Sequence, residues 1–290
     1  MGILKNIKSY VEFIKNQMLA SNKIQHDGFM ALIELKDLIL NQQTTNLQVN
    51  HKNPLNNFGN KCFSQSDEDG ITLEILRRIN IKKGFFVELG VGDGLENNTL
   101  ILSATGWSGF WVGSEELVFD YSKSTCFNYI KTWLTLENIS QVVANGMKLN
   151  NIEKIDVLSM DLDGNDIYYI NKLLSEEITP SLVIVEYNAK FIPPITFQID
   201  YDPEHKWSGD DYFGAALANF VEIFEKYKYK LVCCNSHTGA NAFFVKNEYK
   251  EMFNDVPNDI LDIYVPPRYY LYTNHGHKQS VKVVEKILNR

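Results

Sequence analysis

The sequence predicts an α/β domain whose central sheet is mostly parallel and closes with an antiparallel hairpin, preceded by a helical extension. Three observations support this fold class. Apolar, strand-like runs alternate with helical stretches over residues 63–246, a pattern typical of parallel sheets. One of these strands enters a glycine-rich turn that begins at Gly90. The last two strands are joined by a short segment around Gly239, so we expect them to pair antiparallel.

Composition and charge limit the function classes. Of 290 residues, 44% are hydrophobic, which suffices for one large core with a small appendage. The 36 acidic residues outnumber the 28 basic ones, and the lysines and arginines are scattered, so we expect no nucleic-acid partner. No apolar run approaches about 20 residues, the length that spans a bilayer, so we expect no membrane span. The four cysteines lack disulfide or metal spacing, which favours reduced thiols in a cytoplasmic protein.

The first 45 residues form a predicted helical extension. Ile7, Val11, Ile14 and Met18 recur at helical spacing and share one face. A second apolar cluster over residues 29–40 follows an expected break at Gly28. Two interpretations fit this pattern equally: the helices join two copies of the chain as a homo-oligomer, or they pack on the main domain. An asparagine-rich stretch then predicts a linker over residues 46–60.

The main domain is predicted over residues 61–250. Ser66 and Asp69 have the spacing of a capping box, and they precede a helix with an apolar stripe at Ile71, Ile75 and Ile79. The other predicted elements are strands at 84–89, 110–112, 156–160, 182–186, 230–234 and 242–246, and a helix at 212–226. Residues 251–290 are set apart as a C-terminal extension, with an expected terminal helix and no assigned role.

The glycine-rich turn has the spacing G-x-G-x-G rather than the dinucleotide fingerprint G-x-G-x-x-G. Glu88, Asp93 and Glu96 surround it. Acidic side chains here disfavour a pyrophosphate and suit a ligand that carries ammonium and sulfonium charges. The alternative is an ordinary glycine-rich connection between a strand and a helix.

Adenosine ligands in such folds usually receive an acidic side chain from the end of the second strand, where it binds the ribose hydroxyls. Gly113 follows that strand directly, so the acid must be Glu115 or Glu116. An equally good interpretation places these two residues in the first turn of a helix, where the helix dipole favours acids.

Acidic residues also follow the next two strands. Asp161, Asp163 and Asp166 come after the strand at 156–160, and Glu186 ends the strand at 182–186. Carboxylates on neighbouring strand ends provide either a site for a hard cation or a general base. The alternative is helix capping by Asp163, Asn165 and Asp166.

Four residues are candidates for substrate binding. Trp207 and Tyr212 are aromatic and provide candidate stacking surfaces. Asn188 follows Glu186 closely, and His237 lies in the turn between the last two strands, where a solvated histidine is the alternative.

Seven sequence blocks carry a resemblance to a known family. In order they are FSQSDEDG, GFFVELGVGDGLENNT, GWSGFWV, LSMDLDGNDIYY, VIVEYNAKF, YFGAALANF and GANAFFVK, from residue 63 to residue 246. Together they resemble the FkbM-like family of S-adenosylmethionine-dependent O-methyltransferases, many of which are associated with bacterial surface saccharides. The resemblance implies a Rossmann-like class I methyltransferase fold with a seven-stranded sheet.

The resemblance also implies roles for individual residues. It places the methionine part of S-adenosylmethionine against the glycine turn. It also places Gln65 beside the cofactor. The sequence departs from the family at Gly113, where relatives often have the ribose-binding acid. The similar macrocin-type sugar methyltransferases suggest Mg²⁺ or another divalent cation on Asp161 and Glu186. The cofactor-binding set is Gln65, Glu88, Gly90, Gly92, Asp93, Asn98, Thr99, Glu115 and Asp161.

The resulting hypothesis is methyl transfer from S-adenosylmethionine to a sugar hydroxyl, on a nucleotide sugar or on a capsule or other surface saccharide. Asp161 or Asp163 would take the hydroxyl proton, or a cation on Asp161 and Glu186 would lower its pKa. Two alternatives are an NAD-dependent nucleotide-sugar oxidoreductase or epimerase, which the glycine spacing disfavours, and a non-catalytic saccharide-binding protein of the same fold.

Overall fold

The structure is a computed structural model that describes residues 2–237 and 240–267, with side chains from Glu12 onward. The chain divides into two units, Met1–Asn46 and Leu47–Arg290. Within the described residues, no helix combines the length and the apolar character needed to cross a membrane.

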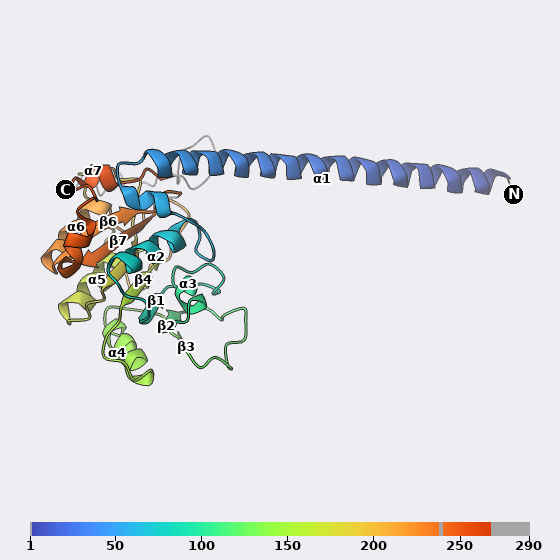
Figure 1. Cartoon of the computed structure of the whole chain (residues 1–290). Helices are drawn as coiled ribbons and strands as arrows, with labels where there is room; N and C mark the ends of the chain where they lie inside the picture. The colour runs from blue at the N-terminus through green and yellow to red at the C-terminus, as the bar shows by residue number, and fades with distance from the viewer. Residues whose placement is uncertain (1, 238–239, 268–290) are drawn as a thin grey trace. The chain divides into compact units, whose positions relative to one another are not determined.

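The first unit is part of one helix, α1 (Gly2–Asn50), drawn in blue in Figure 1. The break expected at Gly28 does not occur. A Cβ atom at Gly28 would meet no atom within 4 Å, so this glycine is simply exposed. An exposed glycine costs a helix about 1 kcal/mol relative to alanine, which is too little to end it. The large apolar side chains of this helix from Phe13 to Ile39 are mostly exposed, whereas those of Ile7 and Val11 lie outside the described side chains.

The linker predicted over residues 46–60 is not seen. Helix α1 continues to Asn50, and a short 3₁₀ helix, η1 (Pro54–Phe58), follows. The buried carboxamides of Asn53 and Asn56 donate hydrogen bonds to the carbonyls of Val232 and Cys234, at 2.8 and 2.9 Å. These carbonyls belong to the edge strand of the sheet, so η1 satisfies backbone groups that an open edge would expose.

The second unit is built on a seven-stranded sheet with the order β3-β2-β1-β4-β5-β7-β6. The pairs among β1 to β5 are parallel, and β7 runs antiparallel to both β5 and β6. This confirms the predicted mostly parallel seven-stranded sheet with an antiparallel C-terminal hairpin. Strand β3 was not located from the sequence. The strands are β1 (Phe85–Leu89), β2 (Ser108–Gly113), β3 (Phe127–Lys131), β4 (Val157–Met160), β5 (Leu182–Glu186), β6 (Tyr229–Cys234) and β7 (Asn241–Lys246).

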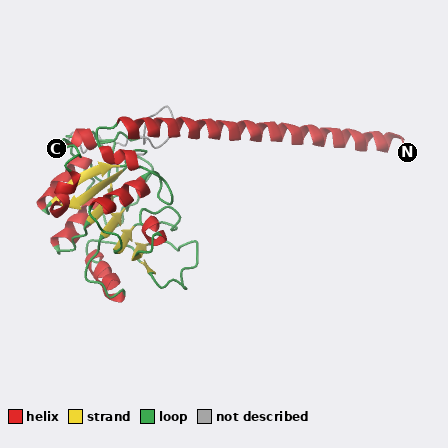
Figure 2. Ribbon diagram, in the orientation of Figure 1, coloured by secondary structure: helices red, strands yellow, loops and turns green. Residues whose placement is uncertain are grey.

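The helices of this unit lie on both sides of the sheet (Figure 2). The strand order reverses direction between β1 and β4, so right-handed crossovers place helices on opposite faces and leave a crevice at the carboxyl ends of these two strands. Helix α4 contacts α5, and α5 contacts α6. The helices are α2 (Glu68–Arg78), α3 (Leu100–Ala104), α4 (Ile139–Leu149), α5 (Asp166–Ser175), α6 (Leu217–Lys226), η2 (Asn247–Phe253) and α7 (Ile260–Ile263).

The capping box predicted at Ser66 and Asp69 does not form. Helix α2 begins after Asp67, whose side chain makes no cap bond. The Asp69 carboxylate instead accepts hydrogen bonds from the backbone N–H groups of Cys62, Phe63 and Ser64, at 2.6 to 2.9 Å. It therefore fixes the segment before α2 rather than the helix terminus.

The first part of the predicted C-terminal extension belongs to the core. Phe253, Ile263 and Val265 are buried with the sheet residues. The hydroxyl of Tyr264 donates a 2.6 Å hydrogen bond to the carbonyl of Ala189. Residues 251–265 thus complete the domain, whereas the expected terminal helix lies outside the described residues.

Candidate active site

A cavity of about 820 Å³ opens at the carboxyl ends of β1 to β4, within the size range of small-molecule sites. Four connections, one after each of these strands, supply most of its wall. The remainder comes from Tyr169 of α5 and from residues 205–207. The lining residues are Gly90, Val91, Gly92, Asp93, Leu95, Glu96, Gly113, Ser114, Glu115, Thr132, Trp133, Leu134, Asp161, Leu162, Asp163, Asn165, Tyr169, His205, Lys206 and Trp207.

The two glycines after β1 have different surroundings. Gly90 has a φ of +90°, its N–H bonds to the Val112 carbonyl at 2.9 Å, and a Cβ there would lie 1.7 Å from the Asp161 carbonyl oxygen. Only glycine fits this close approach of two connections. Gly92 has a φ of +49°, and a Cβ there would meet nothing within 4 Å. The first glycine is required by packing, and the second leaves room for a ligand.

Glu88, Asn98 and Thr99 lie behind the glycine turn and outside the cavity lining, although the sequence assigned them to the cofactor. The Glu88 carboxylate accepts hydrogen bonds from the N–H groups of Asn98 and Thr99, at 2.8 and 3.0 Å, and from the Thr99 hydroxyl at 2.6 Å. Burial raises the pKa of Glu88 to about 7, against the lowering effect of these bonds. These three residues hold the turn in place, because the Glu88 carboxylate accepts hydrogen bonds from the backbone N–H groups that precede α3.

The acid after β2 is Glu115, which lines the cavity. Glu116 instead forms an ion pair with Lys131. The alternative of helix-terminal acids is wrong, because no helix begins between Gly113 and Phe127. A Cβ at Gly113 would lie 2.9 Å from the Tyr129 hydroxyl, so this position has little room for a side chain.

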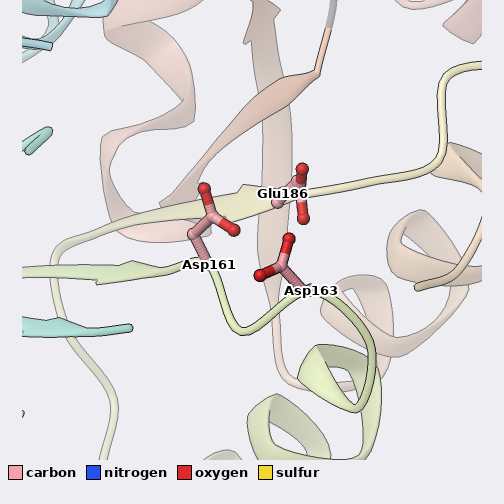
Figure 3. Close-up of side chains that lie close together, drawn as sticks. All are labelled: Asp161, Asp163 and Glu186. Atoms are coloured by element: carbon pink, nitrogen blue, oxygen red, sulfur yellow. The ribbon is translucent and has the colours of Figure 1, made fainter. Parts of the chain in front are cut away.

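Three carboxyl groups converge beside the cavity (Figure 3). Asp161 follows β4, Asp163 lies two residues further on, and Glu186 ends β5; one ligand oxygen of each lies within 4.8 Å of the others. Burial and the charges of Asp163 and Asp166 raise the pKa of Asp161 to about 8. Burial and the charge of Asp161 hold the pKa of Glu186 well above its ordinary value, and a hydrogen bond joins the two side chains. Both carboxyl groups therefore hold a proton to higher pH than an ordinary acid does.

Asp166 has a structural role, but it is not the helix capping that the sequence alternative predicted, because it binds the connection before α5. Its carboxylate accepts hydrogen bonds from the N–H groups of Leu162 and Gly164, at 2.8 and 3.0 Å. Asn165 does not cap α5 through its side chain; it donates a 2.7 Å bond to the Asp202 carbonyl. Asp163, with a φ of +56°, turns its carboxyl group toward the other two acids (Figure 3).

A segment over residues 202–207, here called the rim segment, borders the cavity. It is attached to the connection after β4 by the bond from Asn165, and to the connection after β3 by a 2.8 Å bond from Trp133 Nε1 to the Pro203 carbonyl. His205 rests on Gly164, where a Cβ would lie 2.3 Å from the imidazole Cδ2. His205 Nε2 is buried and has no hydrogen-bond partner within the described residues.

The sequence did not identify several lining residues. Thr132, Trp133 and Leu134 follow β3, and the aromatic and β-branched run FNYIK was the signal for that strand. His205 and Lys206 reach the site through the rim segment, for which the sequence offered no local signal.

The other predicted contacts lie elsewhere. Gln65 is exposed, and neither it nor Tyr212 or His237 lines the cavity. Asn188 is fully buried, and its carboxamide donates 3.0 Å bonds to the carbonyls of Asp211 and Phe213. Of the predicted substrate residues, only Trp207 lines the cavity.

Comparisons with known proteins give similarities in structure only. No family model matches the chain, and no curated protein matches it in sequence. The N-terminal domain of EvdMO1 with SAH bound is similar over 63% of this chain and 82% of that one, at 12% identity and a TM-score of 0.41. An O-methyltransferase from Bacillus cereus in complex with SAH is similar over 71% of this chain and 90% of that one, at 14% identity and a TM-score of 0.40. A putative hemolysin from Streptococcus thermophilus is similar over 70% of this chain and 72% of that one, at 12% identity and a TM-score of 0.40. These identities are too low to assign a family.

Proposed function

We propose that this protein is an S-adenosylmethionine-dependent methyltransferase that acts on a hydroxyl group of a saccharide. The observation that carries the proposal is the occupation of the amides behind the glycine turn by Glu88. A pyrophosphate binds to free N–H groups at such a position, so a dinucleotide is disfavoured. The acids Asp93, Glu96 and Glu115 along the same wall suit a ligand with ammonium and sulfonium charges.

The order of the strands suggests how this cofactor lies. Its methionine part would lie at Gly92 and Asp93 after β1, and Glu115 after β2 would bind the ribose hydroxyls. The adenine would then reach the connection after β3, where Trp133 and Leu134 provide an aromatic and an apolar surface. In this arrangement the sulfur faces the acids after β4.

The acids beside the cavity suit deprotonation of a hydroxyl. When bound, S-adenosylmethionine would supply an electrophilic methyl group, with its sulfur as the leaving group. Asp161 would take the proton of the acceptor hydroxyl as its oxygen attacks that methyl carbon. Three converging carboxylates also fit a hard cation such as Mg²⁺. When bound, such a cation lowers the pKa of a coordinated hydroxyl. Both routes need Asp161 ionised.

This requirement predicts the pH dependence of the reaction. Because the pKa of Asp161 is raised to about 8, its ionised fraction increases as the pH rises through that value. We expect kcat/KM to rise with pH and to level off above about 8. Asp163→Asn removes one of the charges that raise the pKa of Asp161, so it should move the rise to lower pH. Initial rates from pH 6 to 9.5 test both statements, and a rate that is flat over this range would contradict them.

Calorimetric titration with S-adenosylhomocysteine, with NAD as the control, tests the cofactor class. Binding of S-adenosylhomocysteine alone supports the proposal, and binding of NAD alone would favour the oxidoreductase alternative. Transfer of a labelled methyl group to a saccharide then separates an enzyme from a non-catalytic binding protein of the same fold.

We also propose that α1 pairs with a second copy of this chain. Its exposed side chains Leu32, Leu35 and Ile39 have heptad spacing. Residues 12–46 carry four acids and three lysines, so two such helices would not repel each other strongly. A helix with an unpacked apolar stripe gains most of its stability from a partner.

Deletion of residues 1–46 is expected to reduce the native mass to that of a monomer and to leave S-adenosylhomocysteine binding unchanged. The reason is that the core and the cavity are made by residues after Asn46. Light scattering coupled to gel filtration measures the mass. A full-length chain that is already monomeric would refute the pairing.

A further inference from the structure

We infer that the acceptor is an uncharged saccharide, that its ring stacks on Trp207, and that nucleoside-diphosphate sugars are rejected. This inference rests on the proposed methyltransferase function and names the substrate class of the same site.

The first support is the environment of Trp207. Its side chain is 41% exposed and lines the cavity. The indole Nε1 donates a 2.8 Å hydrogen bond to the Asp210 carbonyl, and the ring packs edge-on against Phe213 at 6.1 Å. The ring is thus fixed although much of its surface meets solvent. A fixed, exposed aromatic face binds an apolar sugar face with little further loss of conformational freedom.

The second support is the position of this ring relative to the other tryptophan of the cavity. Phe213, which packs on Trp207, accepts a bond from Asn188, two residues after Glu186 of β5. Trp133 instead follows β3, beside the strand that precedes Glu115. The two indoles therefore come from different parts of the fold, although Trp133 Nε1 donates a hydrogen bond to the Pro203 carbonyl of the rim segment that carries Trp207. Trp133 follows the strand of the proposed adenine site, whereas Trp207 lies on the rim segment, whose His205 rests on Gly164 next to Asp163.

The third support is the charge of the lining. Lys206 is the one lysine or arginine among the described lining residues. Five acids line the same cavity: Asp93, Glu96, Glu115, Asp161 and Asp163. Lys206 Nζ lies 5.6 Å from the centre of the Trp133 ring, on the proposed adenine side. A diphosphate beside Asp161 and Asp163 would lie against two acids, with Lys206 as the one basic side chain of the described lining.

Four backbone N–H groups that precede helices beside the cavity are already occupied by internal carboxylates. A phosphate could bind N–H groups at a helix N-terminus. The N–H groups of Leu162 and Gly164, before α5, already donate to Asp166, and those of Asn98 and Thr99, before α3, donate to Glu88. In the connections after β1 and β4, these N–H groups are therefore hydrogen-bonded to an internal carboxylate. An uncharged ring needs neither a basic side chain nor a free amide.

The experiment compares two sets of acceptors in labelled methyl transfer, each with and without Mg²⁺. The uncharged set is the methyl glycosides of glucose, galactose, rhamnose and fucose, and the charged set is UDP-glucose, UDP-galactose and dTDP-rhamnose. We expect kcat/KM to be at least about ten-fold higher for the best uncharged acceptor than for any nucleotide sugar. Preference for a nucleotide sugar under either condition, or transfer to neither set while S-adenosylhomocysteine still binds, would overturn the inference. If the protein does not bind S-adenosylhomocysteine at all, the proposed function itself is refuted.

A matched pair of variants tests the role of Trp207. Trp207→Ala should raise the acceptor KM about ten-fold and leave the S-adenosylhomocysteine Kd unchanged, and Trp207→Phe should restore most of the lost affinity. Trp133→Ala should do the opposite, with a weaker S-adenosylhomocysteine Kd and a smaller change in acceptor KM. An unchanged acceptor KM in Trp207→Ala, or an equal loss of cofactor affinity in both alanine variants, would show that the ring does not bind the acceptor.

Discussion

Replacement of Asp161 by asparagine is expected to lower methyl transfer by about a thousand-fold or more and to change the S-adenosylhomocysteine Kd by less than about three-fold. In the proposed mechanism, Asp161 is the one acid that would serve both routes, as direct proton acceptor and as cation ligand. Asparagine has the same shape, and it preserves the backbone bond from residue 161 to the Leu89 carbonyl. It also avoids burying a new charge. Single-turnover rates and calorimetry on the same preparation separate the two effects.

Glu186→Gln distinguishes the two routes. Glutamine still hydrogen-bonds to Asp161 but offers a weaker ligand to a cation. If Asp161 takes the proton directly, this variant should keep most of the activity. If a divalent cation is used, activity should fall and recover in excess Mg²⁺. A fully active Asp161→Asn variant would exclude both routes and remove the acid pair from the mechanism.

The parts of the fold that local sequence determines were predictable. Strand β1 is a fully buried, mostly apolar run that a glycine follows, and β5 ends at an acid, so both were bounded by a change of residue type. The antiparallel pairing of β6 with β7 followed from the short connection between them.

Other parts depend on contacts between residues distant in sequence. Asn53 looked like a linker residue because it is polar, but its carboxamide satisfies an edge-strand carbonyl at Val232. Asp69 has the spacing of a cap but binds the segment before the helix. Strand β3 is only partly buried, so its apolar pattern is weak. In each case a tertiary hydrogen bond or the edge of the sheet outweighs local preference.

The candidate site shows the same division. Acids at the strand ends were correctly expected to converge, because parallel strands end at one edge of the sheet. The sequence could not show that Glu88 faces away from the cavity, since alternation alone does not say which side of the sheet holds the ligand. Nor could it bring His205 onto Gly164, because this contact joins two connections through the rim segment.

Replacement of Gly90 by alanine is expected to lower the free energy of unfolding by about 3–5 kcal/mol and to abolish S-adenosylhomocysteine binding. The added Cβ would lie 1.7 Å from the Asp161 carbonyl oxygen, on a backbone with a φ of +90°. That oxygen belongs to the backbone and follows β4 directly, so relief requires a shift of the connection that carries the acids. Denaturant unfolding measures the loss of stability.

Gly92→Ala is the matched control, because it makes the same chemical change two residues away. Its Cβ would meet nothing within 4 Å, and its φ of +49° lies in the left-handed region. That backbone strain costs about 1–2 kcal/mol, so the variant should fold. If the cofactor lies against this turn, the new methyl group occupies its space, and S-adenosylhomocysteine should bind at least about thirty-fold more weakly. Unchanged affinity in a folded Gly92→Ala protein would place the ligand elsewhere in the cavity, whereas equal stability of the two variants would show that the contact between Gly90 and Asp161 does not hold the site together.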